Sequence, residues 1–287
     1  MVVEFMGVTF NGITPEVAKS KVGEVLLDLL EKTQLDQIHI REVIFAPLDQ
    51  FEMAIKKHNP SEVFLPGTQA VGKAVPIFGT NPKELAVIIH KNLLLRLIDP
   101  TAPFKLKTSL SVISHEFGHC KDLIQRDSFT PPQDESFLRF EPQLDRRVGI
   151  WVEEFMADRN TSWLYTPEIF REEILEVQVQ IRNILVYIHS EYQKVKNREI
   201  DPVLAAFTTM DCIWDIIREL QRLVAFCAGK FDLHLELKQT EIIEFDFKGL
   251  VIFLTSEYES LMSLYPNWKP EMFAFLKTVF GTGFIIT

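Results

Sequence analysis

Apolar residues recur at helical spacing along much of the chain. Between Pro15 and Lys32 they lie three or four positions apart, Thr14 stands where a helix N-cap is expected, and proline occupies the first turn. This pattern predicts a helix over 15–32. Comparable patterns predict further helices over 49–58, 108–125, 144–164, 167–196, 202–228, 250–264 and 270–280.

Other segments show strand or loop patterns. Ile38–Ala46 is rich in β-branched residues and Leu85–Lys91 is a compact apolar run, so both are predicted strands. Residues 59–82 are rich in proline and glycine and predict a loop with a short strand near 74–78. A second loop is predicted over 128–142, and alternation predicts a β-ribbon over 231–247.

These elements predict a helix-rich α+β fold with a small β-sheet. The chain has 287 residues, 47% of them hydrophobic, which suffices for one large domain or for two lobes that share a cleft. We place a first domain over residues 1–165 and a mainly helical C-terminal lobe over 166–287.

Composition narrows the function classes. The formal net charge is −10, which argues against general nucleic-acid binding because that activity needs a basic surface. We find neither a secretory signal nor an apolar stretch long enough to cross a membrane. Three cysteines without CxxC spacing suit a reducing cytoplasm, which is the expected location.

One motif carries specific chemistry, the HExxH sequence His115-Glu-Phe-Gly-His119. On a helix, residues four apart lie on the same face, so both imidazoles can reach one metal ion. Glu116 lies about 100° away around the helix and can reach a water molecule at that ion. The alternative interpretation is two histidines on a polar helix face beside an unrelated glutamate.

A second helix offers the third ligand that a catalytic zinc site requires. Glu154 and Asp158 lie four apart among apolar residues, so one can bind the metal while the other accepts a hydrogen bond from a ligating histidine. The residues alone leave open which acid does which. A solvent-exposed acidic face is the alternative.

The two motifs together resemble the gluzincin branch of the zincin metallopeptidases, in which HExxH precedes ExxxD on a second helix. The resemblance covers roughly residues 14–165 and implies a minimal zincin core that binds one zinc ion. It implies that His115, His119 and Glu154 are ligands, that Glu116 is the general base and that Asp158 supports a ligating histidine. It also implies that Leu85–Lys91 is the edge strand that pairs with an extended substrate. The chain has no HExxHxxGxxH sequence and therefore does not resemble the metzincins.

The expected function is zinc-dependent hydrolysis of peptide bonds in a peptide or protein substrate. Candidates for stabilising the oxyanion or contacting substrate include Tyr165, His90 and Arg147. Hydrolysis of a non-peptide amide is a second enzymatic reading. A binding or regulatory protein that retains a metallopeptidase fold is the non-enzymatic one. The oligomeric state is left open.

Overall fold

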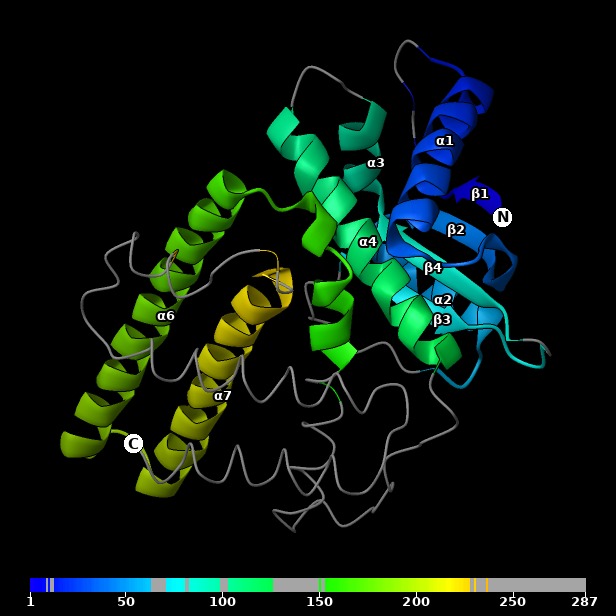
Figure 1. Ribbon diagram of the computed structural model, residues 1–287. Coiled ribbons are helices and arrows are strands. Elements are labelled where there is room, and N and C mark those ends of the chain that lie inside the picture. The colour runs from blue at the N-terminus through cyan, green and yellow to red at the C-terminus, as the bar shows by residue number, and fades with distance from the viewer. Residues whose placement is uncertain are drawn as a thin grey trace. The chain divides into compact units, whose positions relative to one another are not determined.

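The computed structural model gives a helix-rich α+β fold (Figure 1). It describes residues 1–8, 10, 13–62, 71–80, 83–98, 103–125, 150, 153–227, 230 and 236. The chain divides into two compact units between Phe129 and Thr130, whereas the sequence places a boundary after residue 165. Each unit is described by itself.

The first unit contains a four-stranded sheet with the order β1-β2-β4-β3. The first three strands in this order run parallel, and β3 pairs with β4 in the antiparallel direction. The strands are β1 (Val2–Phe5), β2 (Ile40–Ala46), β3 (Gly72–Pro76) and β4 (Leu85–His90). The predictions for β2 and β4 are confirmed, β3 starts two residues before the predicted short strand, and β1 is an element that the sequence analysis missed.

The edge strands of the described sheet are β1 and β3, so β4 is not an edge strand, which corrects the expectation for Leu85–Lys91. Strand β4 lies between β2 and β3, and its first five residues are buried. A continuous apolar run is typical of a strand covered on both faces, whereas β3 carries glycine, lysine and proline, which are common at sheet edges.

Helices cover both faces of the sheet in this unit. The helices are α1 (Pro15–Thr33), α2 (Phe51–His58), α3 (Lys91–Ile98) and α4 (Pro103–Gln125). Helices α1, α3 and α4 pack together on one face, and α2 covers the other (Figure 1). The Thr14 side chain accepts a hydrogen bond from the Val17 N–H at 3.4 Å, which confirms the predicted N-cap. Helix α3 has no counterpart in the sequence analysis.

Strand alternation decides which residues meet α4. Ile44, Val75 and Ile88 share a buried cluster with α2 residues. Their neighbours along each strand therefore point to the opposite face, toward α4. Gly72 belongs to this second set because it pairs with Ile89.

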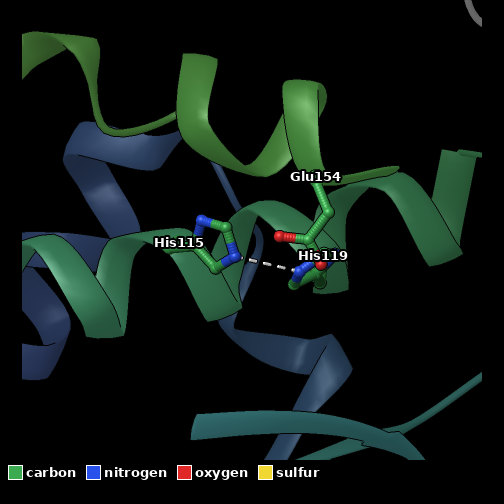
Figure 2. Close-up of side chains that lie close together, drawn as sticks. All are labelled: His115, His119 and Glu154. Atoms are coloured by element: carbon green, nitrogen blue, oxygen red, sulfur yellow. Dashed lines mark hydrogen bonds between the residues drawn. The ribbon is translucent and has the colours of Figure 1, made fainter. Parts of the chain in front are cut away.

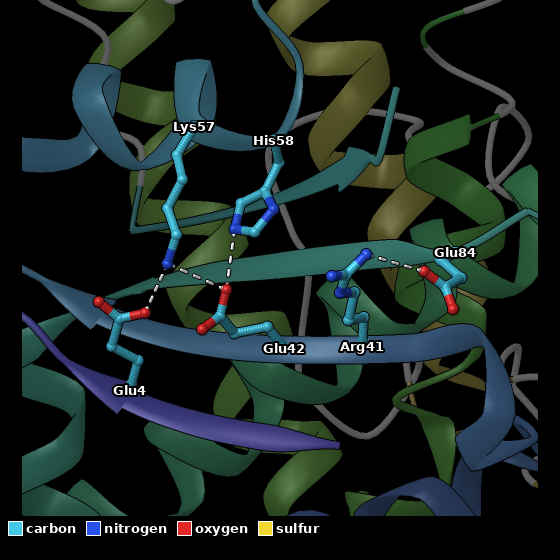
Figure 3. Close-up of polar contacts among 6 residues, drawn as sticks. All are labelled: Glu4, Arg41, Glu42, Lys57, His58 and Glu84. Carbon is cyan, nitrogen blue, oxygen red and sulfur yellow. Dashed lines mark hydrogen bonds and ion pairs between the residues drawn. The ribbon is translucent and has the colours of Figure 1, made fainter. Parts of the chain in front are cut away.

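A polar cluster joins the C-terminal end of α2 to the first two strands (Figure 3). The Lys57 ammonium donates to Glu4 at 2.6 Å and to Glu42 at 3.3 Å, and Nε2 of His58 lies 2.9 Å from the Glu42 carboxylate. The hydrogen bond to Glu4 is the main cause of a raised Lys57 pKa. Burial lowers the pKa of His58 and raises that of Glu42.

The second unit is built on a helical hairpin. Residues 153–159 are helical, inside the predicted segment 144–164, and are followed by η3 (Ser162–Leu164), α6 (Pro167–Lys196) and α7 (Pro202–Cys227). Helices α6 and α7 pack against each other and confirm two predicted helices. Within the described helices, none is both long and apolar enough to cross a membrane.

The remaining predicted elements fall outside the described residues. These are the loop over 128–142 and the helices over 250–264 and 270–280. Of the predicted β-ribbon over 231–247, the structure describes only Glu236, which is helical. Its carboxylate accepts a hydrogen bond from Arg171 of α6 at 2.6 Å.

Candidate metal centre

Helix α4 presents the HExxH residues because its apolar side is fixed in the core. Ile113, Phe117 and Cys120 are fully buried, and this spacing of three and four residues sets the rotation of the helix about its axis. The Ser109 hydroxyl donates to the carbonyl of Leu93 at 3.1 Å, which also fixes α4 to α3. Packing of this apolar side therefore fixes the direction in which α4 presents the HExxH side chains.

The two histidines of the motif lie close enough to share one ion. Figure 2 shows their rings on successive turns of α4, with the Nε2 atoms 3.1 Å apart. Two nitrogens bound to one tetrahedral zinc at 2.0–2.1 Å stand about 3.3 Å apart, so the observed separation needs only a small adjustment. The same distance accommodates a hydrogen bond between the rings when one Nε2 carries a proton.

Glu116 follows His115 and points toward the sheet. Its residue surface is only 7% exposed, and its carboxylate lies against Gly72 at the start of β3. The sequence predicts the helical position of Glu116 but not this neighbour. Burial raises the pKa of the Cys120 thiol well above its usual value, and the Glu116 carboxylate adds to the shift.

The predicted third ligand, Glu154, belongs to the second unit. His115 and His119 of the first unit and Glu154 of the second carry the kinds of ligand atom that a zinc ion prefers. Figure 2 draws all three. The first unit by itself establishes only the histidine pair, so the coordination by Glu154 is part of the proposal below.

Within the second unit, Glu154 has a cationic neighbour. Arg218 of α7 donates a hydrogen bond from Nη2 to Oε2 of Glu154 at 3.0 Å. The Glu154 side chain is 21% exposed, and this charge-assisted hydrogen bond holds its carboxylate in place. Sequence reasoning missed Arg218 because no local pattern links α7 to residues 153–159.

Asp158 is also in the second unit and is 7% exposed. Burial by itself would lower the pKa of the Arg222 guanidinium. The nearby acidic groups, of which Glu219 has the largest effect and Asp158 the next, outweigh burial and raise this pKa. The predicted role of Asp158 beside a ligating histidine stays a prediction.

The three residues considered for oxyanion or substrate contacts have different outcomes. His90 follows Ile88 by two positions on β4, and its ring lies 6.4 Å from that of Phe51 in α2, so it belongs to the sheet face opposite α4. His90 therefore does not lie on the sheet face that α4 covers, and its contact with the oxyanion or substrate stays a prediction. Tyr165 stacks on Phe226 at 4.2 Å within the second unit, and Arg147 lies outside the described residues.

We compared the chain with protein-family models, with curated proteins and with solved structures, and none of these comparisons gave a match.

Proposed function

We propose that this protein is a zinc-dependent hydrolase that cleaves peptide bonds. The observation that carries the proposal is the pair of imidazole nitrogens 3.1 Å apart on one face of α4, with a buried glutamate between them in the sequence. The resemblance of HExxH and ExxxD to the gluzincins supports the reaction class.

The donor set fits zinc. We assign His115, His119 and Glu154 as the ligands, because two imidazoles and one carboxylate are ordinary zinc donors and leave a fourth position open. When bound, zinc supplies a Lewis acid that polarises a carbonyl and lowers the pKa of water to about 7. Arg218 donates a hydrogen bond to Oε2 of Glu154, which helps to hold the carboxylate that we assign to the metal.

Glu116 acts as the general base in this proposal. Its carboxylate accepts a proton as the water oxygen attacks the carbonyl carbon of the peptide. The C–N bond then breaks, and Glu116 returns the proton to the leaving amine. We further propose that Asp158 accepts a hydrogen bond from a ligating histidine and that β3, as the edge strand beside Glu116, lines the substrate site.

We also propose a cytoplasmic location. Cys120, Cys212 and Cys227 are all described and buried, and none of them forms a disulfide, which suits a reducing compartment.

The decisive experiment combines metal analysis with a peptide-library assay on the wild type and on Glu116→Gln. We expect about one zinc per chain in both, with hydrolysis by the wild type alone. Absence of zinc from the wild type would overturn the proposal. Zinc retained without cleavage of any peptide would favour a binding protein, or an enzyme for another amide if such a substrate is cleaved.

Separate alanine variants at Glu154 and Asp158 test the assignment of the third ligand. We expect zinc loss in Glu154→Ala. Zinc loss confined to Asp158→Ala would exchange the two roles.

A further inference from the structure

Gly72 begins β3, and the sheet register places it on the face that α4 covers. Its backbone lies outside the left-handed region, so its conformation is one that any residue can adopt. Glycine in a strand costs stability and often marks a place where another group approaches closely. The close neighbour here is Glu116.

A side chain at position 72 would collide with the carboxylate of Glu116. A Cβ atom built on Gly72 would lie 2.6 Å from both Cγ and Oε1 of Glu116 and 2.8 Å from Cδ. Ordinary contacts of this kind are about 3.5 Å or longer. The Glu116 side chain would therefore have to move by roughly 1 Å, and it is already buried between α4 and the sheet.

We propose that Gly72 is a positioning residue for the general base, an inference that rests on the proposed function. The missing side chain lets the Glu116 carboxylate lie against the backbone of the edge strand. The strand then limits where the carboxylate can go on that side. Proton transfer needs the base within hydrogen-bond reach of its water, and a misplacement of about 1 Å can reduce a rate on the order of 100-fold.

The first test compares Gly72→Ala with a matched control, Gly23→Ala. Gly23 lies in α1, and a Cβ there would meet nothing within 4 Å. We expect Gly72→Ala to lower kcat on the order of 100-fold while zinc content and KM change less than about twofold. The control should keep wild-type kcat. Unchanged kcat in Gly72→Ala would overturn the proposal.

A second test asks whether the effect passes through Glu116. In the Glu116→Gln background the base is already lost, so Gly72→Ala should lower the residual rate less than about twofold. An equal loss of rate in both backgrounds would show damage to the strand and would overturn the positioning role.

A third readout is thermal stability, which does not depend on activity. Gly72→Ala should lower the melting temperature in the wild-type background and much less in Glu116→Ala, which removes the colliding atoms. If Gly72→Ala does not fold, the double variant decides: folding supports the proposal, and failure to fold refutes it. An inactive wild type would overturn the proposed function, whereas an active Gly72→Ala would overturn only the role of Gly72.

Discussion

Replacing His119 by alanine removes one of the two imidazoles of α4 that we propose as metal ligands. The helix itself should be preserved, because alanine has the highest helix propensity and His119 is not part of the fully buried apolar side. The partner ring of His115 stays in place on the preceding turn. The variant therefore isolates the contribution of one ligand nitrogen to zinc binding.

The size of the effect follows from the number of ligands and from the geometry. Four-ligand structural zinc sites are worth about 10–16 kcal/mol, so an equal share is roughly 2.5–4 kcal/mol for each ligand. Because the Nε2 atoms of His115 and His119 are already 3.1 Å apart, little of this energy is used to bring them together. Zinc affinity should fall roughly 100- to 1,000-fold in His119→Ala.

Competition with a coloured zinc chelator measures the affinity directly, and calorimetry with and without zinc measures its effect on stability. Zinc at about 100 times its dissociation constant should stabilise the wild type by about 2.7 kcal/mol, and the variant should lose nearly all of this gain. His189→Ala is the control, since His189 is exposed on α6 and contacts Gln193. Equal zinc affinity in His119→Ala and the wild type would refute the shared-ion geometry.

Two further predictions concern charged groups. Arg218→Met should weaken zinc binding about 10-fold although Glu154 is intact, because the variant loses the hydrogen bond to that carboxylate. Arg218→Lys should lose less affinity than Arg218→Met. Unchanged affinity of Arg218→Met in the chelator assay would contradict a role for this hydrogen bond. Burial lowers the pKa of His58 in the folded protein, so as the pH falls the unfolded chain takes up a proton on this residue before the folded protein does. The free energy of unfolding should therefore fall as the pH drops below about 6.5. Urea unfolding between pH 7.5 and 5 should show a shallower pH slope for His58→Gln, and equal slopes would exclude this contribution.

Elements with strong local signals were predictable from the sequence. Helices α1 and α6 each begin at a threonine cap followed by proline, and both caps form in the structure, at Thr14 and Thr166. Strand β1 and helix α3 lack such signals. The four residues of β1 become a strand by pairing with β2, and α3 follows β4 without a connecting loop, so its apolar residues merge with those of the strand.

Local sequence pattern predicts part of the candidate site, and tertiary packing determines the rest. Helical periodicity suffices to predict that His115 and His119 share a face, because one turn separates them. The position of Glu116 against Gly72 depends on how α4 packs on β3, which no spacing within either segment encodes. The sequence nevertheless marked β3 by its glycine, lysine and proline, and these residues could have identified the edge strand.

The choice between Glu154 and Asp158 shows why a third ligand is the hardest part of such a site to predict. Spacing places both acids on one helical face and cannot rank them. The second unit distinguishes them by their surroundings: Glu154 is 21% exposed in its side chain and Arg218 binds one of its oxygens, whereas Asp158 is buried near the Arg222 guanidinium. Carboxylates that bind a metal are commonly hydrogen-bonded as well, and Glu154 is the more exposed of the two acids and accepts such a bond from Arg218. This physical difference supports the proposal that Glu154, and not Asp158, is the third ligand.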